Sequence, residues 1–214
     1  MSGHILVATG TRREGAALSL PDAVVIPGGG DAAALMAKLR AAAPGARGII
    51  SFGFAGALDE TLRLGDWVIG ERLSGACDAC CDPAWSRALA ARMPDARFGT
   101  FYADGRLISN VQEKQSLGQR GLLAADMESH IAAGVAADCA LPFAIIRCIS
   151  DEARHALPPA IAVAMRPDGG VNGWAMLGSL VRKPGQVPEM VRTMRGFMRA
   201  MAALKAGGAK IRLV

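Results

Sequence analysis

The chain has 214 residues, of which 51% are hydrophobic, 20% charged and 5% aromatic, and its formal net charge is +5. A chain of this length buries a sizeable core in one compact domain, and its apolar fraction excludes a disordered protein. No apolar stretch reaches the roughly 18–20 residues that a membrane-spanning helix needs. The first residues resemble neither a signal peptide nor a transit peptide. We therefore expect one cytoplasmic domain over residues 1–214.

The basic charge lies in the C-terminal stretch. From Leu180 onward there are eight Lys and Arg residues and one acidic residue, whereas the preceding residues have sixteen basic and eighteen acidic side chains. A nucleic-acid-binding protein typically combines a broad basic surface with aromatic side chains that stack on bases, and this chain has one Tyr and three Trp. We expect no nucleic-acid partner.

Five cysteines, an odd number, favour reduced thiols over a disulfide framework. The spacing of Cys77, Cys80 and Cys81 is one with which a zinc site can begin. No second Cys or His pair follows at a suitable distance, because His130 and His155 are scattered. We expect a loop with incidental thiols and no metal.

Short apolar runs alternate with Ala-rich helical stretches in chain order. The predicted strands cover residues 4–9, 23–27, 48–52, 67–70, 97–103, 106–109 and 143–149. Helices are predicted from a cap at Asp31 to about residue 42, and over residues 126–137. The continuous apolar run at 143–149 is typical of a strand that is buried on both faces. The alternation predicts an α/β fold of three layers in a single domain.

A further helix is predicted after Pro188, with Glu189 in its first turn. One face of this helix is apolar: Met190, Val191, Met194, Phe197, Met198, Met201 and Leu204. Basic residues lie mostly elsewhere. Two interpretations stay open: a C-terminal helix packed on the sheet, which we favour, and a basic amphipathic helix that contacts a membrane surface or an apolar ligand.

Several catalytic motifs are absent or incomplete. Gly10 and Gly15 have the spacing of a phosphate-binding loop, but Ala16 and Ala17 stand where Lys and Ser or Thr are required. No G-x-S-x-G or H-E-x-x-H motif is present. The remaining candidates are acidic residues near strand ends, where α/β sheets collect ligands: Glu14, Glu128 and Asp151.

Three segments then resemble the purine nucleoside phosphorylase/nucleosidase superfamily. Residues 53–58 (GFAGAL) with 64–68 (LGDWV) are similar to its G-x-A-G-G-L and GD-x-V segment. Residues 126–129 (DMES) resemble its ribose motif, and residues 142–151 (PFAIIRCISD) resemble its strand ending in R-x-I-S-D. The segments follow one another in the family's order. The resemblance implies a three-layer α/β/α sandwich with a central mixed, partly barrel-like sheet.

The resemblance also implies how a purine nucleoside is cleaved. Asp151 would donate a proton or a hydrogen bond to purine N7, which requires a protonated carboxyl in a dry pocket. Glu128 would accept hydrogen bonds from the ribose hydroxyls, Met127 would pack under the ribose, and the main chain near Leu107 and Ile108 would contact adenine. The substrate-binding residues implied by the resemblance are Glu128, Met127, Phe54, Ala55, Gly56, Leu107 and Ile108.

The resemblance leaves two nucleophiles open. Glu14 corresponds to the acid that activates water in nucleosidases. Arg12 and Arg13, together with the amide of Gly53, are instead candidates to hold inorganic phosphate as a co-substrate. Phe54 stands where many relatives have Ser or Thr, which removes a hydroxyl that would bind either nucleophile. The resemblance favours phosphorolysis slightly, and it implies no cofactor.

The tail is similar to that of one subfamily. Residues 178–188 and the basic helix after them resemble the C-terminal extension of hopanoid-associated phosphorylases, which implies adenine release from adenosylhopane, a lipid nucleoside. We expect residues 178–214 to form a basic, Met-rich extension and to contact the inner membrane face. The resemblance further implies a homo-oligomer, with a dimer as the first expectation. The alternatives are a nucleosidase for methylthioadenosine, S-adenosylhomocysteine or futalosine, and a binding module without catalysis.

Overall fold

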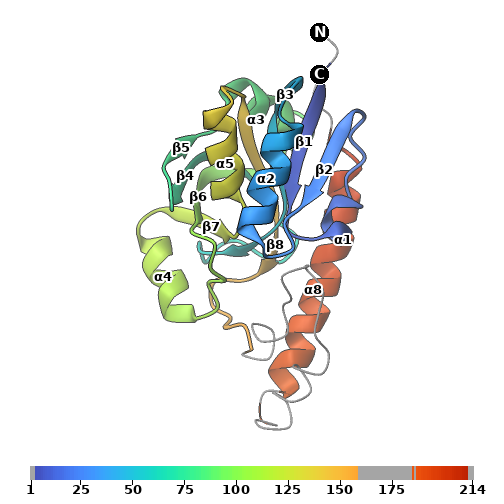
Figure 1. Ribbon diagram of the computed structural model, residues 1–214. Helices are drawn as coiled ribbons and strands as arrows, with labels where there is room; N and C mark the ends of the chain where they lie inside the picture. The colour runs from blue at the N-terminus through green and yellow to red at the C-terminus, as the bar shows by residue number, and fades with distance from the viewer. Residues whose placement is uncertain (1–2, 159–184, 186, 212–214) are drawn as a thin grey trace.

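The computed structural model describes residues 3–158, 185 and 187–211 (Figure 1). Its strands are β1 (His4–Thr9), β2 (Ala23–Pro27), β3 (Ala46–Ala57), β4 (Trp67–Gly75), β5 (Ala79–Cys80), β6 (Arg97–Ala103), β7 (Leu122–Asp126) and β8 (Phe143–Asp151). Its helices are α1 (Arg12–Gly15), α2 (Ala32–Ala42), α3 (Pro83–Ala90), α4 (Val111–Gln119), α5 (Ser129–Asp138) and α8 (Val187–Gly208).

Five strands close into a mixed barrel. β3 pairs with β8 in parallel and with β7 antiparallel, β7 and β4 both pair with β6 in parallel, and β4 pairs with β8 antiparallel. β1 and β2 extend the sheet from β3 as parallel strands, and β5 extends it from β4. The expected mixed, partly barrel-like sheet is confirmed.

Helices cover both faces of this sheet. α2 and α5 pack together on one face, and their apolar residues, among them Leu39 and Val135, join the strands in one core cluster (Figure 1). Residues of α3 and α8, among them Leu89 and Leu204, join the other face in a second cluster. This arrangement gives the predicted α/β/α layers.

Side-chain caps explain where several helices begin. Asp31 Oδ1 accepts a hydrogen bond from the Ala34 amide at 2.9 Å, which confirms the predicted start of α2. Asn110 caps α4 in the same way through the amide of Glu113, at 2.8 Å. The helix that this cap begins has Lys114 and Leu117 as its buried residues.

The structure corrects two predicted elements near β7. Residues 106–109 are not a strand but part of a loop. The predicted helix at 126–137 is α5, which begins at Ser129, because Asp126 is the last residue of the unpredicted strand Leu122–Asp126. β7 is short and buried at every position, so it shows no alternation, and Asp126 ends the strand before α5 begins at Ser129.

The C-terminal helix α8 has two dissimilar halves. Its second half packs on the sheet, where Leu204 is fully buried. In its first half, several apolar side chains of the predicted face are exposed: Val191, Met194, Phe197 and Met198. Residues 178–184, 186 and 212–214 of the expected extension lie outside the described residues. Within the described part, no helix is long and apolar enough to cross a membrane.

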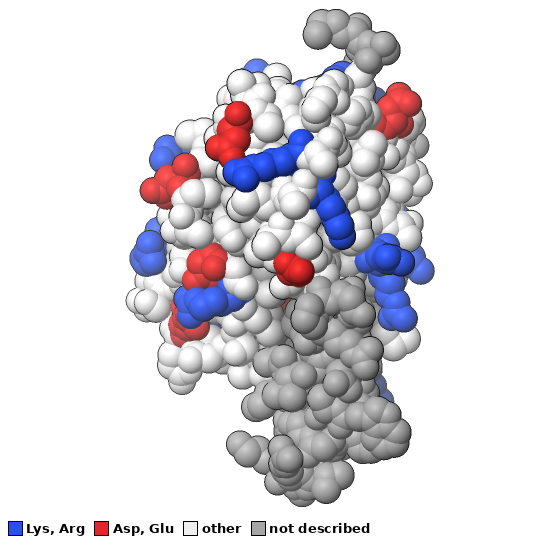
Figure 2. Space-filling model, viewed as in Figure 1, with Lys and Arg blue, Asp and Glu red and all other residues white. Residues whose placement is uncertain are grey.

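Charged side chains are interspersed on the face drawn in Figure 2. Basic and acidic groups alternate there over the white, uncharged surface, and they do not gather into one basic patch. This distribution agrees with a body of the chain that is close to charge balance.

Candidate active site

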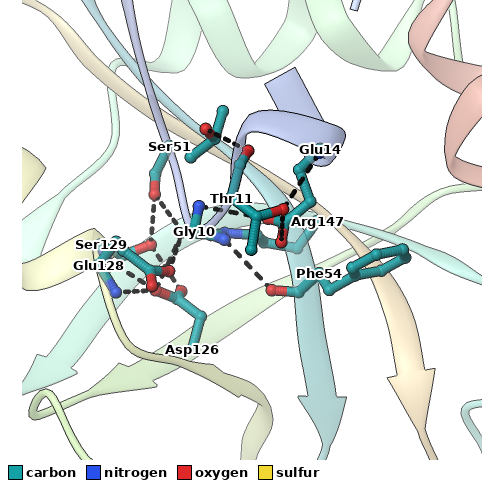
Figure 3. Close-up of polar contacts among 10 residues, drawn as sticks. Gly10, Thr11, Glu14, Ser51, Phe54, Asp126, Glu128, Ser129 and Arg147 are labelled. Atoms are coloured by element: carbon teal, nitrogen blue, oxygen red, sulfur yellow. Dashed lines mark hydrogen bonds and ion pairs between the residues drawn. The ribbon is translucent and has the colours of Figure 1, made fainter. Parts of the chain in front are cut away.

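Arg147 of β8 is the centre of a buried group of charges at one end of the barrel (Figure 3). Its Nη2 donates to Ser51 Oγ at 2.6 Å and to Asp126 Oδ1 at 3.1 Å, and it lies 3.4 Å from Glu128 Oε2. Its Nη1 donates to the carbonyl oxygen of Phe54 at 3.2 Å. We call Arg147 with Glu14, Asp126 and Glu128 the Arg147 cluster.

Asp126, at the end of β7, shapes the turn that presents Glu128. Its Oδ1 accepts hydrogen bonds from the amides of Glu128 and Ser129, at 2.9 and 2.7 Å. Its Oδ2 accepts from Ser129 Oγ at 2.6 Å. The DMES segment is therefore a carboxylate-capped turn, and the capping carboxylate also pairs with Arg147.

Glu14 reaches the same group from α1, whose N-cap is Thr11. Its carboxylate accepts hydrogen bonds from the amide of Gly10 at 3.2 Å and from Thr11 Oγ1 at 3.0 Å, and also from the main chain of Phe54. Gly53 has a φ of +142° and lies against Glu14 so closely that no Cβ would fit. The main-chain groups of Gly10 and Phe54 beside Gly53 thus already bind the carboxyl group of Glu14.

Burial changes the proton affinity of the Arg147 cluster. It raises the pKa of Glu14 above its ordinary value, although Arg147 and the hydrogen bonds offset part of this rise. Burial likewise raises the pKa of Glu128 to about 7, against the opposing effect of Arg147. For Arg147 burial works in the other direction, but the carboxylates of Asp126, Glu128 and Glu14 prevail and raise its pKa. A carboxylate with a raised pKa suits general base catalysis near neutral pH.

A small cavity of about 30 Å³ lies beside Glu128 and Met127. Its walls come from the loops after β2, β6 and β7 and from the first turns of α2 and α5: Gly28, Gly30, Asp31, Ala32, Leu35, Gly105, Met127, Glu128 and Ile131. The two residues of the expected ribose motif therefore border the same hollow.

Asp151 ends β8 and pairs with a lysine that the sequence did not indicate. Lys114 of α4 has a fully buried side chain, and its Nζ donates to Asp151 Oδ2. Ser150 Oγ donates to the other carboxylate oxygen of Asp151 at 2.8 Å. On the neighbouring strand β3, a Cβ at Gly56 would lie only 2.9 Å from Asp151 Oδ2. A larger residue at this position would therefore press against the carboxylate. We call Lys114 with Asp151 the Lys114 pair.

Strand β3 connects the two groups. Gly53 faces Glu14 and Arg147, and Gly56 faces Asp151. Three residues of a strand span roughly 10 Å. The segment from Gly53 through Phe54 and Ala55 to Gly56 therefore lies between the carboxyl groups of Glu14 and Asp151.

The other candidate residues occupy different surroundings. Arg12 and Arg13 are exposed on α1 and take part in no described ion pair, whereas Glu14 beside them is buried. Ile108 is buried in a small apolar cluster with Leu58 and Leu117, and Leu107 is half-buried. Their loop is bound to the segment after β8, where the Leu157 amide donates to the Ser109 carbonyl at 2.9 Å.

Three polar residues of the site were not assigned a role from the sequence. Asp126 and Arg147 lie inside the segments that carry the resemblance, and Arg147 is the single charge in the apolar run of β8, which is a usable signal for a buried functional group. Lys114 gave no such signal. Among the described residues, no group of three or more His, Cys, Asp or Glu side chains could hold a metal ion.

The fold is that of nucleoside-cleaving enzymes of known structure. A 5′-methylthioadenosine/S-adenosylhomocysteine nucleosidase from Neisseria meningitidis superimposes with a TM-score of 0.63 at 18% identity, over 85% of this chain and 99% of that chain. The futalosine hydrolase of Helicobacter pylori gives 0.60 at 14% identity, over 94% and 97%. A uridine phosphorylase from Vibrio fischeri gives 0.62 at 15% identity, over 97% and 90%.

Similarity at these identities defines the class of fold, the nucleoside phosphorylase fold. A comparison with curated protein sequences finds no significant match. The family model of the phosphorylase superfamily matches residues 21–163, which is most of the chain. The protein belongs to this superfamily of phosphorylase and nucleosidase enzymes.

Proposed function

We propose that the protein hydrolyses the N-glycosidic bond of an adenine nucleoside, with water as the nucleophile. The observation that carries this proposal is the position of Glu14. Its buried carboxylate lies against Gly53, with the main chain of Phe54 and the guanidinium of Arg147 beside it. A base held there can accept a proton from a water molecule that attacks the sugar.

The surroundings of Glu14 oppose phosphate as the nucleophile. The main-chain amides near Gly53, which are candidates for an anion site, already bind Glu14. The cation within reach, Arg147, is already surrounded by three carboxylates. Arg12 and Arg13 are exposed on α1. A phosphate dianion at this position would meet like charge at short range, which favours hydrolysis over the phosphorolysis that the sequence slightly favoured.

The proposed reaction divides its proton transfers between the two groups. Water adds to the anomeric carbon and gives a proton to Glu14, while the electron pair of the glycosidic bond leaves with the purine. Asp151 gives a proton to purine N7, so that the base departs neutral. Glu128 accepts hydrogen bonds from the ribose hydroxyls, which stabilises an oxocarbenium-like sugar, and Met127 packs under the ring.

An apolar 5′ substituent fits the wall next to this site. The rings of Phe54 and Phe197 lie with their centroids 5.2 Å apart, so that the exposed apolar half of α8 continues from the motif on β3. Met194 and Met198 extend the same helix, and methionine adapts to irregular apolar shapes. We therefore take adenosylhopane as the lipid substrate to test, and methylthioadenosine as the small one, because nucleosidases for the latter share the fold.

Contact with a membrane and self-association are further parts of this proposal. Basic residues of α8 (Arg192, Arg195 and Arg199) are exposed near its exposed apolar side chains, and each basic group near an anionic leaflet adds about 1 kcal/mol. Replacing these arginines with glutamine should reduce sedimentation with anionic vesicles. The dimer that the resemblance implies is testable by analytical ultracentrifugation.

The test is adenine release by the purified protein in phosphate-free buffer. We expect adenine from at least one of adenosylhopane, methylthioadenosine and S-adenosylhomocysteine, and about 10²–10⁴-fold less from Asp151→Asn. A higher kcat/KM for adenosylhopane supports the apolar 5′ group, and a preference for methylthioadenosine contradicts it. No release from any nucleoside by folded protein would contradict the whole proposal.

A further inference from the structure

Lys114 is a buried charge that the proposed reaction does not yet use. It lies on α4, well apart from the Arg147 cluster, and its side chain has no exposed surface. Its Nζ donates to Asp151 Oδ2, to the carbonyl oxygen of Glu152 at 3.2 Å and to that of His155 at 3.0 Å. All three hydrogens of the ammonium group therefore have a partner.

The three partners differ in what they can accept. The carbonyl oxygens of Glu152 and His155 accept hydrogen bonds, whereas the carboxylate of Asp151 can also take up the proton itself. Because the side chain is buried, Lys114 has no direct contact with bulk water. Among its described partners, Asp151 is thus the group with which Lys114 can exchange a proton.

Both forms of this pair satisfy their hydrogen bonds. With the proton on Lys114, the ammonium group donates three times. With the proton on Asp151, the neutral amine still donates to the two carbonyls and accepts from the carboxyl group. Such a site holds one transferable proton beside Gly56, where an added Cβ would lie 2.9 Å from one carboxylate oxygen of Asp151 and 3.3 Å from the other.

We propose that Lys114 is a positioning residue that holds Asp151 toward Gly56 and supplies the proton that Asp151 passes to the leaving base. This inference rests on the proposed function. The proton moves from Lys114 Nζ to Asp151, and from Asp151 to purine N7, as the glycosidic electron pair goes to the purine. Lys114 is left as a neutral amine, and when the products leave it regains a proton from solvent through Asp151, whose side chain is 14% exposed.

Two substitutions separate proton supply from other roles. Lys114→Met removes the charge and the proton, whereas Lys114→Arg keeps the charge and the donors but does not release a proton at these pH values. Lys38→Met, on the exposed surface of α2, is the matched control. The readout is kcat/KM for adenine release from about pH 5 to about pH 8, with thermal unfolding as a check of folding.

We expect both Lys114 variants to lose activity by a factor that grows with pH, up to about tenfold per pH unit, because Asp151 must then take its proton from solvent. A deficit that does not change with pH would show a structural role and overturn the inference. A deficit that shrinks as pH rises, or a Lys114→Arg variant that behaves as wild type, would show an electrostatic role and overturn it equally. If Lys114→Arg does not fold, the pH dependence of Lys114→Met decides.

The same series separates this inference from the proposed function. If the wild-type protein releases adenine and Asp151→Asn does not, the proposed function is supported, whatever the activity of the Lys114 variants. Wild-type protein without turnover of any nucleoside would overturn the function and the inference with it.

Discussion

The Arg147 cluster and the Lys114 pair lie near opposite ends of one short segment of β3, and they balance charge in different ways. The cluster places three carboxylates around one guanidinium, so acid is in excess. The pair places one carboxylate against one ammonium. In the cluster, burial raises the pKa of Glu14 and of Glu128 against the opposing effect of Arg147, whereas in the pair one ammonium group donates to one carboxylate. The two sites thus differ in the ratio of carboxylates to cations that they bury.

Replacing Arg147 in the Arg147 cluster should lower the free energy of unfolding far more than replacing Lys114 in the Lys114 pair. Arg147→Met leaves three buried carboxylates without a counter-charge, and we expect unfolding to become about 3–5 kcal/mol easier. Lys114→Met leaves one carboxylate, which retains 14% side-chain exposure, and should cost less. Urea unfolding at neutral pH measures both. Arg154→Ala, which breaks an exposed ion pair with Glu60, is the control and should cost less than about 1 kcal/mol.

The sequence predicted most of this fold and part of the site. The periodic strands at 4–9, 23–27 and 97–103 coincide with β1, β2 and β6. The mixed barrel followed from the resemblance. β7 was not predicted, because a short strand that is buried throughout has no alternation.

The partners of the acidic residues depend on tertiary structure. Glu14 and Glu128 were candidates because they are acids beside predicted elements, and the structure brings both to Arg147. Lys114 could not be found in this way. It is separated from Asp151 by 37 residues, and only the packing of α4 against the end of β8 brings the two side chains together. A lysine on an amphipathic helix ordinarily indicates a solvated face.

Glu14→Gln tests whether the carboxylate of Glu14 in the Arg147 cluster acts as the general base. The amide keeps the size of the side chain but cannot accept a proton from water, and we expect kcat for adenine release to fall about 10²–10⁴-fold. Binding of adenine, measured by calorimetry, should change little. Glu189→Gln, on the partly exposed first turn of α8, is the matched control. Unchanged kcat in Glu14→Gln would assign the base elsewhere.

Glu128→Gln should remove a pH dependence of stability that belongs to the cluster. Burial raises the pKa of Glu128 from 4.5 to about 7, so the folded state binds this proton more tightly than the unfolded state. The resulting stabilisation is complete below about pH 4.5 and is lost as pH rises through about 7. Relative to wild type, Glu128→Gln should therefore gain a few degrees in Tm across this interval. If Tm depends on pH in the same way for the wild type and for Glu128→Gln, the raised pKa assigned to Glu128 is wrong.

Phe197→Ala should have the smallest effect, because it acts on the substrate and not on either charge group. An aromatic pair contributes about 0.5–1.5 kcal/mol beyond its buried area, so we expect a loss of about tenfold in kcat/KM for a nucleoside with an apolar 5′ group. Turnover of adenosine should change less. Phe98→Ala replaces an equally exposed ring at the start of β6 and serves as the control. Equal losses for both nucleosides would argue against a 5′ contact.

The central claim is that the main-chain groups beside Gly53 bind Glu14, so that water attacks the sugar. Product analysis by phosphorus NMR at saturating phosphate, together with the rate of adenine release with and without phosphate, tests it most directly. We predict no sugar 1-phosphate, and an adenine release rate that phosphate does not increase. Formation of a sugar 1-phosphate as the main product would contradict the claim, because phosphate would then occupy the place assigned to Glu14 and water.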